Sequence, residues 1–405
     1  MTMRAGMGHS RMELPPGLPM DGYGARRSPA TGTRDPLEAT VLLVADDLCT
    51  TVVVSLDLVA VGSSLVERVQ RCVHEWVPEA HVMIAATHTH AGPSGVRSAV
   101  AGEAVTEAII DAVRISARNA AATAEAVDAQ IGVGELPAGV ATNRNTPEAA
   151  IDRRLTVLEL TRYDGSRVGL LWHTGVHPTV LGPDNLEYSA DLPGEVRRRM
   201  RNSDEPVLFL NGAAGDVSTR FTRRDRNENE LERLGELLNG ALPATGHSIV
   251  LSPVVVRERT VTLAVAHHDR DHAEQLRRAT EQRLTSTQLG TGDRRRLESV
   301  LEGLLKVQRG PQKGGSIQAR VQVLRMGGLV LICLPGEPVS ALSLHQPEDA
   351  AVTSLVVGYA NGYIGYLTSQ PDDYAYETLA SQVETGSGAH LMAAANEQVR
   401  EILCG

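Results

Sequence analysis

Two histidines separated by one residue stand directly after an apolar segment. His88 and His90 follow the run HVMIAAT, and Gly92 and Pro93 come next in what reads as a loop. On an extended strand, residues i and i+2 point to the same face, so the two imidazoles are expected to lie side by side. Neutral imidazole is a common zinc ligand and also a general acid or base near neutral pH. The pair therefore indicates a metal site, or one ligand beside one acid/base group, with ordinary loop histidines as the alternative.

Other apolar runs also end in polar side chains. His177 follows GLLWHTGV, Asp216 and Ser218 come after VLFLNGAAG, and Glu337 ends LVLICLPGE, while a tyrosine-rich loop follows VTSLVV. A tight turn whose aspartate bonds to its own backbone would explain Asp216 equally well. A carboxylate at the end of a buried strand, such as Glu337, is costly unless it is paired or bound to a cation. This recurrence at strand ends predicts one site at one edge of a sheet.

The segments that must position these residues alternate between predicted strands and predicted helices. Apolar runs of strand length are interleaved with segments of helical period, which predicts an α/β or mixed α+β fold with a large mixed sheet. We expect one domain over residues 1–405 that carries a charged helical insertion at 268–308, and no separate C-terminal β-sandwich domain. The first 35 residues are rich in Gly, Pro and Arg and are expected to form an ordered loop. Asp191 is expected to be the N-cap of a helix.

Composition restricts the class of protein. The chain has 405 residues, 42% of them hydrophobic, which is enough for a substantial core. A net charge of −10 argues against nucleic acid or an anionic membrane as a partner. We expect neither a secretory signal nor a membrane-inserted segment, because the sequence has no long apolar run. The four cysteines fit neither a disulfide framework nor a CxxC metal site, which favours a cytoplasmic enzyme. A homo-oligomer is compatible with the sequence.

Taken in order, a series of segments resembles the neutral/alkaline (non-lysosomal) ceramidase family. The segments are THTHAGPSG, NRNTP, GVHPTVLGPDNLEYSADLPG, NGAAGDVS, LPGEP and ANGYIGYLTS, with YAYE further on. The resemblance spans most of the chain. It implies the N-terminal catalytic domain of zinc amidases that cleave the N-acyl bond of ceramide.

The resemblance also implies a ligand set for one zinc ion per chain. His88, His177, Glu337 and Tyr366 would hold the ion, with Tyr363 as a nearby competitor of Tyr366. This set of nitrogen and oxygen donors also suits other divalent ions.

The remaining site residues are implied to act on the substrate. His90 would contact the substrate and transfer a proton, Arg144 would orient the substrate, and Tyr376 would polarise the amide carbonyl. Asp216 and Ser218 match an Asp-Val-Ser segment of the family whose serine is a candidate nucleophile. We prefer metal-activated water to Ser218, since no histidine lies near Ser218 in the sequence to act as its base.

The chain also departs from the family. We expect it to lack the secretory leader and the extra C-terminal β-domain of the family's better-known members. After Asp-Val-Ser it continues with TRFTRR, where the family usually has Pro-Asn. Only 3% of the residues are aromatic, which argues against extraction of a lipid from a bilayer. In the basic stretch, Arg220, Arg223 and Arg224 would meet either solvent or an acidic group of the substrate.

We therefore expect a zinc-dependent hydrolase that cleaves the linear C–N bond of a small, soluble N-acylated amine or related amide. Three alternatives stay open. The same site could perform acyl transfer or ring closure on a specialised metabolite. The protein could also be a true ceramidase of lipid metabolism, in sphingolipid turnover, or a zinc-free binding protein that has kept the fold.

Overall fold

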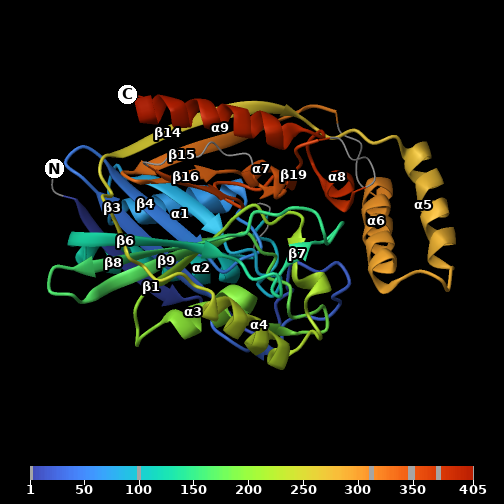
Figure 1. Ribbon diagram of the computed structural model, residues 1–405, viewed down its shortest axis with the longest axis horizontal. Helices are drawn as coiled ribbons and strands as arrows, with labels where there is room; N and C mark the ends of the chain where they lie inside the picture. The colour runs from blue at the N-terminus through green and yellow to red at the C-terminus, as the bar shows by residue number, and fades with distance from the viewer. Residues whose placement is uncertain (1–2, 98–101, 310–313, 345–351, 371–374, 405) are drawn as a thin grey trace.

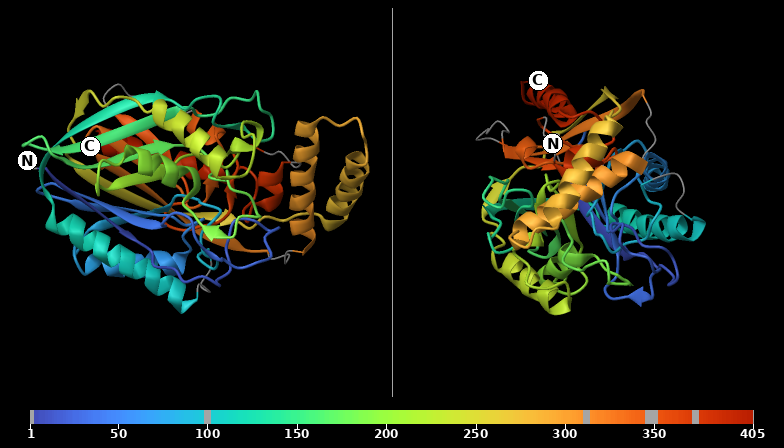
Figure 2. Two further views of the ribbon diagram at one scale, coloured as in Figure 1. Left: turned by 90° about the horizontal axis from the view of Figure 1, so that it is seen from below. Right: turned by 90° about the vertical axis from the view of Figure 1, so that its right-hand side faces the viewer.

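Two β-sheets enclose the centre of the molecule, and helices cover them from outside (Figures 1 and 2). The computed structural model describes residues 3–97, 102–309, 314–344, 352–370 and 375–404. Parallel and antiparallel pairs occur in both sheets, so the predicted mixed α/β class is confirmed.

The larger sheet has the strand order β11-β9-β8-β6-β1-β3-β4-β5, with β13 added to β6. Its strands are β1 (Arg4–Arg11), β3 (Glu38–Ala45), β4 (Thr50–Leu56), β5 (His81–Ala86), β6 (Glu125–Glu135), β8 (Arg154–Arg162), β9 (Arg167–Thr174), β11 (Val207–Asn211) and β13 (His247–Ile249). Only two residue pairs join β1 to β6, so this junction divides the sheet into two sides. The edge strands β5 and β11 contact each other, which shows that the sheet curls back on itself.

The smaller sheet has the order β14-β15-β16-β18 and forms a third side. Its strands are β14 (Val254–Ala264), β15 (Ser316–Met326), β16 (Leu329–Cys333) and β18 (Thr353–Val357). One buried cluster contains Met83 and Leu171 from the two sides of the larger sheet together with Leu331 from the smaller sheet. The three sides therefore share a single apolar interior, whose burial is the main favourable term in folding.

Each of the three sides carries helices on its outer face, as the right-hand view of Figure 2 shows. The helices are α1 (Ser63–His74) and α2 (Glu103–Ala122) on the first side, α3 (Asp191–Met200) and α4 (Glu228–Gly240) on the second, and α9 (Ser387–Cys404) on the third. In α1, Leu65, Val69 and Val73 recur every four residues and are buried, which is the apolar stripe that a helix needs to pack on a sheet.

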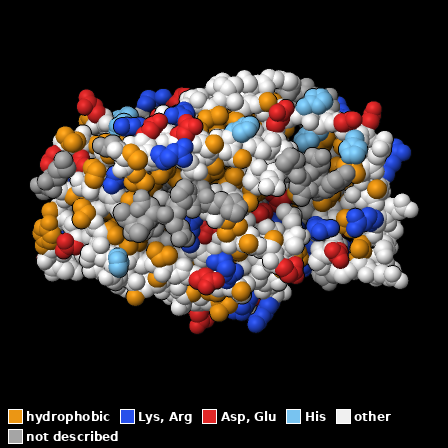
Figure 3. All heavy atoms as spheres, turned by 45° about the horizontal axis from the view of Figure 1, so that its top comes forward, with side chains coloured by type: hydrophobic (Ala, Val, Ile, Leu, Met, Phe, Trp, Pro, Cys, Tyr) orange, Lys and Arg blue, Asp and Glu red, His pale blue; other side chains and the backbone are white. Residues whose placement is uncertain are grey.

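Short elements complete the chain. They are β2 (Gly32–Thr33), β7 (Thr142–Asn143), β10 (Glu187–Tyr188), β12 (Val217–Ser218), η1 (Thr219–Phe221), β17 (Glu337–Pro338), α7 (Ala341–Leu344), β19 (Tyr366–Leu367) and α8 (Tyr376–Ala380). Among the described residues, no helix is long and apolar enough to cross a membrane. Basic and acidic side chains are intermixed over the face shown in Figure 3.

A helical hairpin stands at one end of the molecule, where helices were predicted over 268–308, and ends one residue beyond that range (Figure 1). Its helices are α5 (Arg270–Leu284) and α6 (Thr291–Arg309), which lie between β14 and β15 in the sequence. Because β14 and β15 are paired along their whole length, the hairpin extends from the sheet without interrupting it. The inner helix, α6, packs against α8. The description of residues 1–405 as a single domain stays a prediction.

The prediction of loop for the first 35 residues is wrong for β1, which is an interior strand. The prediction rested on the Gly, Pro and Arg content of this segment, but Gly6 and Gly8 serve close packing of α2 on the sheet. A Cβ atom at Gly6 would overlap the carbonyl oxygen of Ala120, and one at Gly8 would overlap that of Ser116. Here glycine marks the close approach of two backbones rather than a turn.

We predict that Gly6→Ala lowers the free energy of unfolding by about 1–3 kcal/mol, because the added methyl group must push α2 away from β1. Chemical denaturation followed by circular dichroism measures this change. Gly240→Ala is the matched control, since a Cβ atom at Gly240 meets no atom within 4 Å. Equal stability of the two variants would contradict the packing account of β1.

Candidate metal centre

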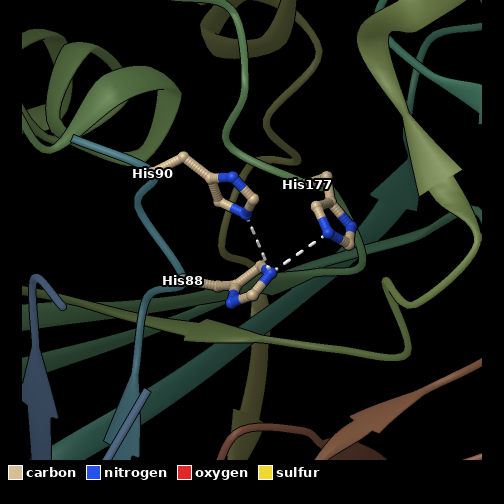
Figure 4. Close-up of side chains that lie close together, drawn as sticks. All are labelled: His88, His90 and His177. Atoms are coloured by element: carbon tan, nitrogen blue, oxygen red, sulfur yellow. Dashed lines mark hydrogen bonds between the residues drawn. The ribbon is translucent and has the colours of Figure 1, made fainter. Parts of the chain in front are cut away.

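Three histidines from two loops meet in one cluster (Figure 4). The Nε2 atom of His88 lies 3.1 Å from Nε2 of His177 and 3.2 Å from Nε2 of His90. One ligand atom from each of the three lies within 4.8 Å of the others, close enough to share a metal ion. His88 and His177 are buried, whereas His90 is partly exposed.

The backbone of a loop, rather than strand alternation, brings His88 and His90 together. Strand β5 ends at Ala86, and His88 has a positive φ of 70°, a conformation that costs a non-glycine residue on the order of 1 kcal/mol. The strand geometry expected for the pair is therefore wrong, although the two imidazoles do meet.

Backbone and ring contacts fix the orientation of His88. Its backbone N–H donates to Leu58 O at 2.9 Å, and its Nδ1 lies 2.6 Å from Val59 O. The ring of Tyr359 stacks on the imidazole with ring centroids 4.1 Å apart. A proton on Nδ1 satisfies the carbonyl of Val59 and leaves the lone pair of Nε2 for the cluster, as in many metal-binding histidines.

The loop after β9 presents His177 in the same way. Its Nδ1 lies 2.7 Å from Ala214 O, and its backbone N–H donates to Val217 O at 3.0 Å. Nε2 is again the free nitrogen. Burial, followed by the proximity of His88, lowers the pKa of His177 well below 6.5. The imidazole is therefore neutral at physiological pH, which is the form that binds metal ions.

Asp191 anchors this loop instead of serving as the predicted N-cap. Helix α3 begins at Asp191, and Ala190 occupies the N-cap position without a side-chain bond. The buried carboxylate accepts hydrogen bonds from the backbone N–H groups of Val180 at 3.1 Å and Leu181 at 2.9 Å. The N-cap expectation is wrong because three backbone donors, including Leu192 at 2.7 Å, take up the carboxylate oxygens.

Glu337 brings a carboxylate to the histidines. Its Oε2 atom lies 3.3 Å from Nε2 of His88 and 3.5 Å from Nε2 of His177, and it is buried without a hydrogen bond. The other oxygen, Oε1, accepts a hydrogen bond from the hydroxyl of Tyr363. Burial would raise the pKa of Glu337, but His88, His177 and the Tyr363 hydrogen bond together hold it below its usual range.

These donors fit a divalent metal ion. A buried carboxylate oxygen with no donor, facing two imidazole nitrogens, would be stabilised in a low-dielectric interior by a cation between them. The Nε2 atom of His90 lies 3.2 Å from Nε2 of His88. Burial and the proximity of the other two histidines also lower its pKa well below 6.5. The division of the three histidines into two ligands and one acid/base group stays a prediction.

Tyr366 lies across from Glu337, since β19 pairs with β17 and these two residues are direct partners. The guanidinium carbon of Arg144 is 5.2 Å from the centroid of the Tyr366 ring. Burial raises the pKa of Tyr366 well above 10, and the positive charge of Arg144 opposes this shift. The structure thus places both predicted tyrosines beside Glu337, with Tyr363 bonded to the carboxylate and Tyr366 next to Arg144.

Arg144 is held between charged and aromatic groups. Its Nε donates to Oε1 of Glu377 at 2.5 Å, and Asn145 Nδ2 donates to the other oxygen at 2.9 Å. The ring centroid of Tyr376 also lies 5.2 Å from its guanidinium carbon. One nitrogen, Nη2, is buried without a partner. This arrangement fixes the guanidinium and leaves one pair of N–H groups for a ligand.

Asp216 connects the loops of the site. Its carboxylate accepts hydrogen bonds from Asn143 Nδ2 at 2.8 Å, from the backbone N–H of Ser340 at 2.7 Å and from Ser340 Oγ at 3.0 Å. Its backbone carbonyl accepts from the N–H of Arg144 at 2.7 Å. With both oxygens engaged, Asp216 is placed to position Arg144 and the loop after Glu337 rather than to react.

Ser218 starts the short helix η1. Its Oγ accepts a hydrogen bond from the backbone N–H of Arg220 at 3.2 Å, as an N-cap serine does. Among the described residues, no hydrogen bond joins this oxygen to an imidazole.

Asn211 was not predicted as a site residue, yet it ties the two histidine loops together. Its Nδ2 donates to Thr87 O at 3.1 Å and to Val176 O at 3.0 Å, and its Oδ1 accepts from the N–H of Val176 at 3.2 Å. Thr87 precedes His88 and Val176 precedes His177. The sequence gives one indication of this role, the position of Asn211 at the end of strand β11 before Gly-Ala-Ala-Gly. It does not show to which loops the side-chain amide forms hydrogen bonds.

A cavity of about 400 Å³ opens beside the cluster. His90 and His177 form part of its wall, together with Ser218, Tyr366 and Tyr376. Arg144 and residues of α6 also line it. The predicted site residues therefore meet around one cavity, with His88 and Glu337 buried behind His90 and His177.

Solved structures of ceramidases have the same fold. A ceramidase complexed with C2 matches with a TM-score of 0.74 at 19% identity, over 99% of this chain and 76% of that chain. The neutral ceramidase from Pseudomonas aeruginosa matches with a TM-score of 0.70 at 20% identity, over 98% and 73% of the two chains. No protein-family model and no curated protein matches the sequence. The resemblance noted in the sequence is thus confirmed at the level of the fold.

We predict that Asn211→Ala lowers the affinity of the site for a divalent metal ion about 10- to 100-fold, because the loops of His88 and His177 lose the side chain that bonds to both. Competition with a chromophoric chelator measures the affinity. Asn202→Ala, at an exposed position, is the control and should bind as the unmodified protein does. Unchanged affinity in a folded Asn211→Ala protein would contradict this role of Asn211.

Proposed function

We propose that this chain is a zinc-dependent amidohydrolase that cleaves the linear C–N bond of a small N-acylated amine. One observation carries the proposal: the Nε2 atoms of His88 and His177 and the unbonded Oε2 of Glu337 converge in a buried site next to a cavity. The similarity of the fold to ceramidases supports an N-acyl substrate. In the reaction, water adds to the carbonyl carbon, the C–N bond breaks, and a carboxylic acid and an amine are released.

The proposed ligands are His88, His177, Glu337 and Tyr366. Two neutral imidazoles with oxygen donors, and no thiolate among them, form a set that zinc accepts. When bound, a zinc ion supplies Lewis acidity and lowers the pKa of a coordinated water from 15.7 to about 7.

Residues around the cavity act on the substrate. His90, neutral and partly exposed, takes up a proton and passes it to the leaving amine. Arg144 offers its unpartnered Nη2 to a substrate oxygen. The hydroxyl of Tyr376 accepts a hydrogen bond from Lys306 Nζ, which leaves its own hydrogen for donation to the amide carbonyl.

Water, rather than Ser218, is the proposed nucleophile. The Oγ atom of Ser218 is used as the cap of η1, and a serine needs an adjacent base to attack an amide. Nearby Asp216 cannot serve as that base while its carboxylate holds Asn143 and Ser340.

We predict that His88→Ala and His177→Ala each remove the metal and abolish amide hydrolysis. In elemental analysis of the purified variants, the zinc content should fall from about one ion per chain to near zero, because each variant keeps only one of the two ligand imidazoles and zinc sites are built mainly on nitrogen and sulfur ligands. His390→Ala, on the exposed face of α9, is the matched control and should keep both metal and activity. Full hydrolysis by a metal-free protein would refute the proposal.

We predict that Tyr366→Phe lowers metal affinity about tenfold or more and Tyr363→Phe lowers it less, because Tyr363 acts through its hydrogen bond to Glu337. Each substitution removes one hydroxyl, so the two variants control for each other. Metal titration of both proteins is the measurement. The reverse order of affinities would assign the fourth ligand to Tyr363.

A further inference from the structure

We infer that the cavity beside the histidines selects substrates that carry an anionic group, a carboxylate or a phosphate, which Arg220, Arg223 and Arg295 bind. The inference rests on the proposed amide hydrolysis for the reaction and adds the class of substrate to it. The binding of the anion itself requires only the arginines.

The cavity contains more positive than negative charge. Five arginines line it, Arg144, Arg220, Arg223, Arg226 and Arg295, against the two glutamates Glu298 and Glu302. Arg144 is paired with Glu377. Among the described residues, no ion pair joins the other four arginines to an aspartate or glutamate.

Neutral oxygens hold three of these arginines in place. Arg220 Nη1 donates to Ser299 Oγ at 2.6 Å, and Arg295 Nη1 donates to the backbone carbonyl of Arg220 at 2.7 Å. Arg223 Nη1 donates to the backbone carbonyl of Thr179. Such partners fix a guanidinium without cancelling its charge, and each guanidinium keeps further N–H groups for a ligand.

The two glutamates do not offset this charge. Glu302 lies 3.4 Å from Lys306 Nζ, on the same helix. Glu298 and Glu302 are both exposed, so water screens their charges.

The arginines also disfavour one another's charge. Burial, followed by the proximity of Arg144 and Arg223, lowers the pKa of Arg220 to about 10. Burial lowers the pKa of Arg223 as well, and Arg226 and Arg295 add to the effect. A bound anion would relieve this repulsion through charge-assisted hydrogen bonds, which are stronger than neutral ones.

Two separate parts of the chain build the anion site. Arg220 and Arg223 lie in and just after η1, whereas Arg295 comes from α6, the inner helix of the hairpin in Figure 1. The hairpin thereby contributes to specificity. Arg224, adjacent to Arg223 in the sequence, is exposed and lies at a separate hollow beside α4.

The inference is tested with pairs of amides that share the reacting amide and differ in the presence of one anionic group. N-Hexanoylglycine and N-hexanoyl-O-phosphoethanolamine are compared with neutral N-hexanoylethanolamine, and N-ethylsuccinamic acid with N-ethylbutanamide, by amine release. We expect at least one anionic member to have a kcat/KM about 10- to 100-fold above that of its neutral partner, the usual range for a charged hydrogen bond. The preferred member distinguishes a carboxylate from a phosphate. Equal kcat/KM within every pair overturns the inference.

Variants assign the selectivity to residues. Arg220→Gln and Arg295→Gln should each lower the anionic-to-neutral ratio of kcat/KM about tenfold or more, whereas Arg224→Gln should leave the ratio unchanged. Because Arg220 and Arg295 belong to different elements, a folding defect in one variant does not affect the test with the other. A ratio that is unaffected in both variants overturns the inference.

A binding measurement separates the inference from the proposed function. The Tm of the metal-loaded protein is measured with increasing succinate and with increasing inorganic phosphate. We expect one of these anions to raise the Tm of the unmodified protein and of Arg224→Gln, but not of Arg220→Gln or Arg295→Gln. Such a result without hydrolysis of any amide would leave the anion site standing and reject the proposed reaction. Hydrolysis of amides without any rise in Tm and without selectivity for anionic substrates would support the proposed reaction and reject the anion site.

Discussion

The contact on which the site depends is that between the buried Oε2 of Glu337 and the imidazoles of His88 and His177. This oxygen receives no hydrogen bond, and the groups beside it are the Nε2 atoms of the two imidazoles. The Nδ1 atoms of both rings are already bonded to backbone carbonyls. Acceptors brought together in this way repel one another unless a cation separates them. A positive ion at their centre would remove this repulsion and stabilise the conformation of the surrounding loops.

The three-sided arrangement of the sheets explains how these groups reach one point. Strands β5, β9, β11 and β16 end on the same side of the shared core, and His88, His177, Asn211 and Glu337 lie at or shortly after those ends. Buried polar side chains then connect the loops. Asn211 bonds to the loops of His88 and His177, Asp191 bonds to a backbone N–H group of the His177 loop, and Asp216 bonds to the N–H of Ser340 after Glu337. The left-handed backbone of His88 shows that the loops, rather than regular strands, set the geometry.

Periodicity was sufficient to predict the fold class and most of the helices and strands, because apolar residues recur with the period of the element they belong to. It failed for β1, where Gly6 and Gly8 allow α2 to approach and so remove the apolar signal. The resemblance placed His88, His177 and Glu337 in one site, and the structure brings them together. Asn211 could not be found, since its role depends on which loops the fold places beside it. The basic stretch grouped Arg224 with Arg220 and Arg223, but only the fold separates Arg224 from the cavity and adds Arg295 to it.

X-ray absorption at the zinc edge of the purified protein tests the central claim most directly, because it reports the atoms bound to the ion. The account predicts a first shell of nitrogen and oxygen at about 2.0–2.1 Å, with the outer-shell scattering of at least two imidazoles and no sulfur. A first shell containing sulfur at about 2.3 Å, or a shell without imidazole scattering, would place the metal elsewhere and contradict the account.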